Sequence, residues 1–202
     1  GNRIRLKFVV KYGKSDILIR KDLAFLIRKE IFNMSFKEID VKNIQKTPFA
    51  MIGDEWMLIT AEKEGSVNTM TASWGGVGIM WGKPAATAYI RPQRCTKEFV
   101  DASEYFTLTF FGGGQKKALG YLGSVSGHDE PDKIDKTDLN LTKIDGHPTF
   151  EEAALVLVCR KLYAQEMKPE CFMGTEEIEK WYPDRDFHTM YIGEIVKAYE
   201  AE

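Results

Sequence analysis

The sequence contains few residues of the kinds that usually form metal sites or disulfides. Its 202 residues include only three His and three Cys. The cysteines, Cys95, Cys159 and Cys171, are far apart and form no C-x-x-C pair, so we expect buried free thiols and not a disulfide framework or a zinc knuckle. The histidines are widely spaced and form no H-E-x-x-H motif. We therefore predict no metal site.

Long apolar runs and an excess of one charge are also missing. No stretch reaches the roughly 18 apolar residues that a membrane helix needs, and the best candidate, residues 17–31, is interrupted by charges such as Arg20 and Lys29. That stretch also lacks the cleavage pattern of a signal peptide, so we expect a cytoplasmic protein without membrane partners. The net charge of −2 gives no global attraction to nucleic acid.

What is present is an ordinary globular composition with an uneven distribution of charge. Hydrophobic residues make up 44% and charged residues 29%, enough for one compact domain with a core. Residues 2–33 hold nine Lys or Arg and three acids, whereas the rest of the chain holds 19 bases and 27 acids, a net charge of −8. The chain therefore changes character near Met34.

This change divides the chain into two parts. We expect residues 1–33 to be an N-terminal extension, as a misassigned start codon upstream of Met34 would produce, and residues 34–202 to be the functional domain. The alternative is an accessory strand and helix, because Leu23, Leu26 and Ile27 have helical spacing.

Strand patterns dominate residues 34–202. Six segments rich in Val, Ile, Thr, Tyr and Phe predict strands at residues 57–61, 68–74, 84–91, 105–111, 153–165 and 188–199. Short helices are predicted at 96–102, where the Thr96 hydroxyl would cap the first turn, at 115–122 and at 175–181. Residues 124–146 have few large apolar side chains and predict a long surface connection.

Three common nucleotide or nucleophile motifs fail on inspection. The segment Gly13-Lys14-Ser15 resembles the end of a phosphate loop, but Phe8 stands where that motif requires its first glycine. The glycines at 75–78 lack the last glycine of a dinucleotide fingerprint. The segment 123–127 has Val125 where a nucleophile elbow needs serine. These failures argue against a P-loop, a Rossmann domain and a serine hydrolase.

Two segments remain as candidates for a ligand site. Residues 68–74 end a strand in small hydroxyl residues and lead into glycines, so the backbone can approach a flat ligand that Trp74 and Trp81 would flank. The second segment carries Arg91, Arg94, Thr96 and Lys97 at a helix start, a suitable nest for a phosphate monoester. The alternatives are a plain hairpin for the first segment and a solvated basic turn for the second.

These segments, with the Ser-Gly-x-Asp and Asp-Lys pattern at 126–133 and the terminal segment 188–195, resemble the flavin reductase-like family, particularly its flavoredoxin branch. The resemblance covers Met34 to the C-terminus. It implies a mainly β fold, a six-stranded antiparallel Greek-key split β-barrel with short peripheral helices, that binds FMN, usually as a homodimer with the flavin near the subunit interface.

The resemblance also implies roles for individual residues. Arg91, Arg94 and Thr96 would hold the phosphate, Ser126 and Gly127 would close over the flavin or the hydride donor, and His188 would lie near the substrate. The alternative for His188 is a structural histidine at a strand start. Where the family usually has Arg after Ser-Gly, this chain has His128. The residues expected along the isoalloxazine are Met70, Thr71, Ala72, Ser73 and Trp74.

Three functions are compatible with these patterns. The first is an FMN-binding oxidoreductase that takes electrons from NADH or NADPH. The second is a flavoredoxin-type carrier that passes electrons through tightly held FMN between protein partners. The third is a binding module without a redox role. Large apolar residues such as Tyr163, Met167, Trp181, Tyr182 and Phe187 favour a homodimer, or a core shared with the helix at 175–181.

Overall fold

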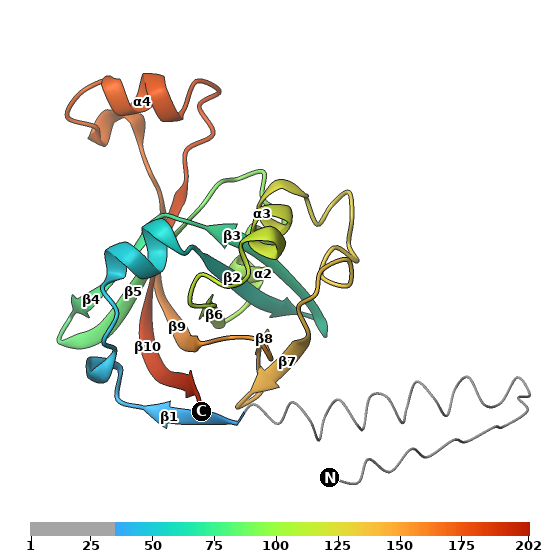
Figure 1. The fold of residues 1–202 in the computed structure, drawn as a ribbon. Helices are drawn as coiled ribbons and strands as arrows, with labels where there is room; N and C mark the ends of the chain where they lie inside the picture. Colours follow the sequence, from blue (N-terminus) through green and yellow to red (C-terminus); the bar gives the residue numbers. More distant parts are fainter. Residues whose placement is uncertain (1–34) are drawn as a thin grey trace, which may run out of the picture. The chain divides into compact units, whose positions relative to one another are not determined.

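The computed structural model describes residues 35–202 and shows a mainly antiparallel β fold with short helices (Figure 1). The expected extension, residues 1–33, lies outside the described residues. Eight strands form the principal sheet, in the order β3-β2-β6-β9-β10-β5-β4 with β1 paired to β10, and β7 and β8 form a separate pair. The strands are β1 (Phe36–Ile39), β2 (Met57–Lys63), β3 (Ser66–Ala72), β4 (Gly75–Met80), β5 (Lys83–Ile90), β6 (Tyr105–Phe110), β7 (Leu141–Ile144), β8 (His147–Phe150), β9 (Leu155–Glu166) and β10 (Thr189–Ala201).

The predicted fold class is confirmed, and all six predicted strand segments are strands. They correspond to β2, β3, β5, β6, β9 and β10. Within residues 35–202 the strand path is open, with β3 and β4 at its two ends, so these strands close no barrel.

The sheet also contains β4, at the glycine-rich segment for which the sequence patterns predicted no strand. A Cβ atom at Gly75 would lie 2.8 Å from the Thr87 carbonyl oxygen, so the absence of a side chain lets β4 lie close against β5. Propensity alone disfavours glycine in strands, which is why this strand was missed.

The three predicted helices are present at nearly the predicted bounds. They are α2 (Cys95–Ala102), α3 (Lys116–Ser124) and α4 (Glu176–Trp181). Residues 35–202 also contain two 3-10 helices, η1 (Val41–Asn43) and η3 (Pro169–Cys171), and a π-helix, η2 (Phe49–Asp54). The predicted cap of α2 is wrong: Arg94 occupies the N-cap position, and the Thr96 hydroxyl instead donates a hydrogen bond to Asn68. None of the described helices is long and apolar enough to cross a membrane.

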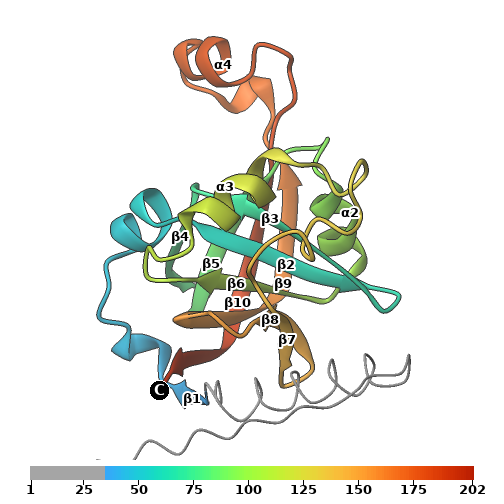
Figure 2. The same ribbon diagram turned by 45° about the vertical axis from the view of Figure 1, so that its right-hand side comes forward.

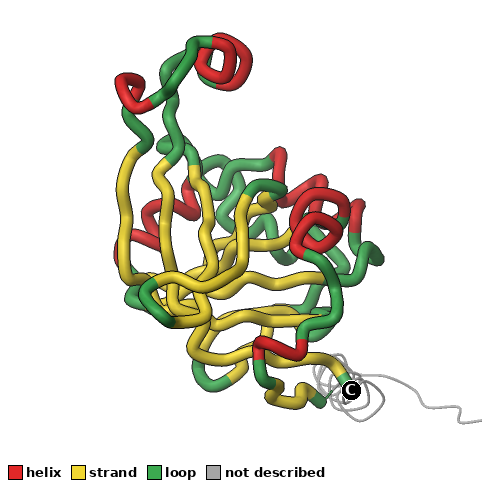
Figure 3. Tube along the Cα trace, turned by 90° about the vertical axis from the view of Figure 1, so that its left-hand side faces the viewer, coloured by secondary structure: helices red, strands yellow, loops and turns green. Residues whose placement is uncertain are grey.

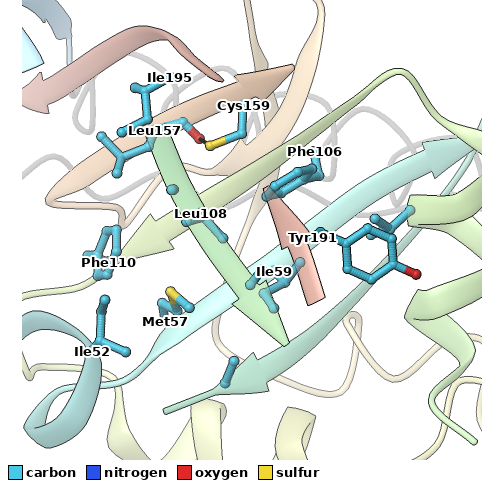
Figure 4. Close-up of a cluster of buried hydrophobic side chains, with 14 of the residues drawn as sticks. Ile52, Met57, Ile59, Phe106, Leu108, Phe110, Leu157, Cys159, Tyr191 and Ile195 are labelled. Atoms are coloured by element: carbon cyan, nitrogen blue, oxygen red, sulfur yellow. Dashed lines mark hydrogen bonds between the residues drawn. The ribbon is translucent and has the colours of Figure 1, made fainter. Parts of the chain in front are cut away.

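The main core lies inside the curved sheet (Figure 4). It contains side chains from the central strands. Gly193 of β10 packs against them, because a Cβ atom at this position would lie 2.9 Å from Cβ of Cys159. Only glycine fits there, so β9 and β10 can pair closely across the bulge at residues 192 and 193. Members of this core include Ile52, Met57, Ile59, Phe106, Leu108, Phe110, Leu157, Cys159, Tyr191 and Ile195.

Residues 124–146 are less exposed than a surface connection should be. Lys133, Ile134 and Leu139 are buried, and the last two pack with α3 in a second apolar cluster. Isolated apolar residues anchor this segment although its average composition is polar. Cys95 and Cys159 are buried free thiols as predicted, but Cys171 is exposed.

Between β9 and β10 the chain leaves the sheet and forms an arm, residues 167–188, that carries η3 and α4. The arm projects beyond the ends of the strands in three views (Figures 1, 2 and 3). Its base is closed by a hydrogen bond of 2.9 Å from the Met167 amide to the His188 carbonyl. The end of β3, the end of β5 and this arm surround the candidate site.

Candidate functional site

A cavity of about 320 Å³ lies where β3 ends. The ladder between β2 and β3 ends at the pair Met57 and Ala72, so Ser73 and Trp74 lie beyond it. Segments that are far apart in the sequence meet around this cavity. The residues that line it are Met70, Thr71, Ala72, Ser73, Trp74, Tyr89, Arg91, Arg94, Trp181 and His188.

Helix α3 is held against one wall of this cavity. The Thr71 hydroxyl donates a hydrogen bond of 2.5 Å to the Leu119 carbonyl, and a Cβ atom at Gly123 would lie 3.2 Å from Cβ of Thr71. This close packing brings the C-terminal end of α3 to the cavity wall.

Two cations converge on that helix end. The guanidinium of Arg94 donates to the Gly123 carbonyl at 2.7 Å, and the ammonium of Lys133 donates to the Val125 carbonyl at 3.0 Å. Carbonyl groups at a helix C-terminus attract positive charge. Within residues 35–202 neither cation has a carboxylate partner in an ion pair.

The electrostatics of this pair are unfavourable in the absence of an anion. Burial lowers the pKa of Arg94, and burial together with the charge of Arg94 lowers the pKa of Lys133 to about 8. Lys133 is only 2% exposed. Two like charges in a partly desolvated place favour a nearby anion.

Arg91 has a different set of partners. Its guanidinium donates to the Trp181 carbonyl at 2.8 Å, forms an ion pair with Asp186 at 2.6 Å and lies over the ring of Tyr182. All three partners belong to the arm. Arg91 thus lines the cavity and also fixes the arm to the end of β5.

The other predicted site residues lie outside this cavity. Thr96 is buried and donates to Oδ1 of Asn68 at 2.8 Å, and Gly127 packs on the same amide, where a Cβ atom would lie 2.2 Å from Nδ2. Ser126 accepts a hydrogen bond from the His128 amide, and Lys97 pairs with Asp101. Thr96 of α2 and Gly127 of the turn therefore meet at Asn68, whereas the contacts of Ser126 and Lys97 are local.

His188 lies on the arm side of the cavity and is buried. Its Nδ1 is 2.9 Å from the Tyr182 hydroxyl, and its ring lies 5.0 Å from that of Trp74. Burial and, next, the charge of Arg91 lower its pKa to about 4. The imidazole is therefore neutral at physiological pH.

Comparison of the chain with known proteins identifies its family. A model described as the flavin reductase like domain matches residues 51–202. The chain belongs to the flavin reductase-like family. No curated protein matches the chain.

Solved structures of flavin reductase-like proteins share the fold at low sequence identity. An FMN-binding domain of a flavin reductases-like enzyme from Shewanella baltica has a TM-score of 0.61 and 18% identity, over 83% of this chain and 78% of that one. Flavoredoxin from Methanosarcina acetivorans has a TM-score of 0.56 and 22% identity, over 73% and 69%. An NADH:FAD oxidoreductase from Streptomyces globisporus, in complex with NAD and FAD fragments, has a TM-score of 0.54 and 18% identity, over 90% and 86%.

The residues of this flavin reductase-like chain fit the phosphate of FMN. Arg94 in the cavity wall and the buried Lys133 supply two cations that have no carboxylate partner within residues 35–202, and residues 70–74 supply the adjoining wall. A phosphate monoester is a dianion near neutral pH and would balance these charges.

Sequence reasoning missed three residues of this flavin reductase-like site. Tyr89 lies near the end of β5 and two residues before Arg91, which directly follows the strand, so the strand period, continued by one residue, would have placed both on one face. Lys133 was seen only as part of a family pattern. Trp181 lines the cavity and lies 5.1 Å from Trp74, whereas the expected partner, Trp81, lies at the turn of the β4 and β5 hairpin. No local signal links residues 74 and 181.

Proposed function

We propose that the protein binds FMN and acts as an oxidoreductase that transfers electrons from NADH or NADPH to flavin, or through bound FMN to an acceptor. One observation carries this proposal. Arg94 lines the cavity walled by residues 70–74, and the buried ammonium of Lys133 binds the same end of α3; within residues 35–202 neither cation pairs with a carboxylate. Family membership supports the same reading.

The residues have distinct tasks in this proposal. Bound flavin supplies the ring that accepts a hydride or single electrons. Arg94 and Lys133 bind the phosphate, and the backbone beyond Ala72, which has left the ladder with β2, faces the ring's polar edge. His188, neutral and bonded to Tyr182, contacts the substrate side without placing a charge there.

Two titrations test the proposal. The purified protein should bind FMN more tightly than riboflavin, because only FMN carries the phosphate. Anaerobic addition of NADH and then NADPH to the FMN-loaded protein should bleach the flavin absorbance with at least one nucleotide. Equal affinity for FMN and riboflavin would refute the phosphate site, and flavin that neither nucleotide reduces would refute the direct reductase activity.

The second candidate is a flavoredoxin-type carrier without direct NAD(P)H activity. It is supported by the fold shared with a flavoredoxin and by the position of His128, which pairs with Glu98 at 2.7 Å on the surface and provides no arginine for a nucleotide phosphate. FMN that stays bound through gel filtration and accepts electrons only from a reduced protein would favour this function.

We also propose that the protein is a homodimer. Tyr182 and Phe187 pack within the arm, so they support the shared-core alternative and not an interface. Other large apolar side chains are exposed: Phe49 is 87% exposed and Trp81 57% exposed. Such a surface favours association with a second copy. Gel filtration with light scattering should give twice the 23.0 kDa monomer mass, and a monomeric mass would refute the dimer.

A further inference from the structure

Met167, Tyr182 and His188 meet at the base of the arm, between two cavities. His188 lines the smaller cavity described above, whereas Met167 and Tyr182 line an adjoining cavity of about 850 Å³. The two cavities share Trp74 and Trp181 in their walls. A contact between Tyr182 and His188 therefore joins the walls of both cavities.

The Tyr182 side chain is fixed by its packing. Its ring stacks on that of Phe187 with an interplanar angle of 27°, meets that of Phe172 edge to face, and has the Arg91 guanidinium over it. Arg91 is held in turn by its ion pair with Asp186. Tyr182 itself is buried. A ring packed in this way has a defined direction for its hydroxyl group, so the contact with the imidazole is built into the arm.

The Tyr182 hydroxyl has one proton and two acceptors within reach. Nδ1 of His188 lies 2.9 Å from the hydroxyl oxygen, and Sδ of Met167 lies 3.7 Å from it. Burial raises the pKa of Tyr182 and the charge of Arg91 opposes that shift, so the hydroxyl keeps its proton at neutral pH. An unprotonated imidazole nitrogen is a much better acceptor than a thioether sulfur. The proton is therefore donated to Nδ1.

This donation determines which nitrogen of His188 carries the imidazole proton. Burial and the charge of Arg91 lower the pKa of His188 to about 4, and a neutral imidazole carries its proton on one nitrogen only. If Nδ1 accepts from Tyr182, that proton is on Nε2. Within residues 35–202 Nε2 forms no hydrogen bond and is not one of the fully buried atoms without a partner. Nε2 is thus the nitrogen that remains for a ligand in the smaller cavity.

We propose that Tyr182 is a positioning residue whose hydroxyl donates to Nδ1 of His188 and keeps the imidazole proton on Nε2, so that the cavity wall offers a neutral hydrogen-bond donor. This inference rests on the proposed function, in which His188 contacts the substrate, and adds that the substrate presents an acceptor atom there. In the opposite arrangement Nδ1 would donate to Tyr182, Tyr182 would donate to Met167, and Nε2 would be an acceptor.

Nitrogen NMR of the histidine rings distinguishes the two arrangements in the protein alone, before any flavin is added. In protein labelled with ¹⁵N-histidine at neutral pH, the signals of His188 are those that disappear in His188→Gln. They should show a protonated Nε2 and an Nδ1 whose resonance is displaced by an accepted hydrogen bond. A proton on Nδ1 would overturn the proposal.

Three conservative variants assign the hydrogen bond to its donor. Tyr182→Phe keeps the ring and removes the hydroxyl, so the Nδ1 resonance should move to the position of a nitrogen that accepts no hydrogen bond. Met167→Leu removes the other acceptor and should leave the resonance unchanged. Tyr121→Phe is the matched control, because Tyr121 donates to Glu130 and lines neither cavity. An unchanged Nδ1 resonance in Tyr182→Phe, or equal changes in all three variants, would overturn the proposal.

A kinetic measurement tests whether Tyr182 acts through His188. In the FMN-loaded protein, Tyr182→Phe should raise the KM for the reducing nucleotide about three- to tenfold, the range expected for one neutral hydrogen bond, and change kcat less than twofold. It should have no further effect in the His188→Gln background. An unchanged KM, or an equal increase in both backgrounds, would overturn the positioning role.

The proposed function and this inference can fail separately. The ring proton and the Nδ1 resonance are measured without flavin, so a protein that shows the expected signals but binds no FMN would refute the flavin proposal and leave the role of Tyr182 standing. A protein that binds FMN and carries the His188 proton on Nδ1 would refute only the present inference.

Discussion

The Tyr182 hydroxyl lies 2.9 Å from Nδ1 of His188, and this contact joins the C-terminal end of α4 to the last residue of the arm, directly before β10. The Tyr182 ring also stacks on that of Phe187, with centroids 4.8 Å apart. The Arg91 guanidinium lies over the Tyr182 ring, 5.1 Å from its centroid. The imidazole therefore occupies a buried place beside a guanidinium, and both features disfavour its protonation.

The first prediction concerns the effect of pH on stability. The pKa of His188 is about 4 in the folded protein and 6.5 in the unfolded chain. Between these values the unfolded chain binds more protons, so the contribution of neutral His188 is fully present above pH 6.5 and is lost as pH falls toward 4. We expect a loss on the order of 2–3 kcal/mol from this group. Urea unfolding at pH 7 and pH 4.5 measures it.

The control for this experiment separates His188 from other titrating groups. His188→Gln should reduce the difference in the free energy of unfolding between the two pH values. His128→Gln, at an exposed position, should keep the wild-type difference. A pH dependence that is the same in all three proteins would contradict the assignment to His188.

The second prediction concerns the phosphate of FMN. Arg94→Gln should lower FMN affinity about 10- to 100-fold, because one charge-assisted hydrogen bond contributes about 1.5–3 kcal/mol. Riboflavin affinity should not change. Lys133→Met should also lower FMN affinity selectively, because it removes the cation beside Arg94 although Lys133 itself does not line the cavity. Lys97→Gln, whose ammonium is paired with Asp101, should change FMN affinity less than threefold. Fluorescence titration of the wild type and the three variants measures these affinities, and equal losses for FMN and riboflavin would contradict a phosphate contact.

The third prediction concerns the turn at Gly127. A methyl group there would lie 2.2 Å from Nδ2 of Asn68, so Gly127→Ala should destabilise the fold by about 1–3 kcal/mol. Gly120→Ala, at an exposed position of α3, should be neutral or stabilise by up to about 1 kcal/mol. Chemical unfolding compares them. If the contact with Asn68 is the cause, the cost of Gly127→Ala should shrink in an Asn68→Ala background.

The fourth prediction concerns the arm. Arg91 is bound to the Trp181 carbonyl and to Asp186, so Arg91→Met should loosen residues 167–188 and leave the sheet intact. Hydrogen exchange by mass spectrometry should show faster exchange in arm peptides and unchanged exchange in β6 and β9. Arg185→Gln, at an exposed position of the same arm, is the control. Unchanged arm protection in Arg91→Met would contradict this role.

Local patterns predicted most of the elements but not all of their contacts. Six strands and three helices follow from side-chain periodicity and turn residues, which act over a few positions. Strand β4 does not, because its glycines are favoured by the close approach of Thr87 and not by propensity. Thr96 has the chemistry of a cap, yet its hydroxyl finds Asn68 instead, 28 residues away.

The sequence by itself determined the family, the mainly β class and the basic segment that contains Arg91 and Arg94, because these depend on residue types in fixed order. Only the tertiary structure decided which of the cations within residues 35–202 have no carboxylate partner in an ion pair. Arg91 is paired with Asp186 across 95 positions, whereas Arg94 meets Lys133 at the end of α3. It also brought Trp181 to Trp74 and so formed the two adjoining cavities. Electrostatic and packing contacts depend on distance in space, which one sequence does not encode locally.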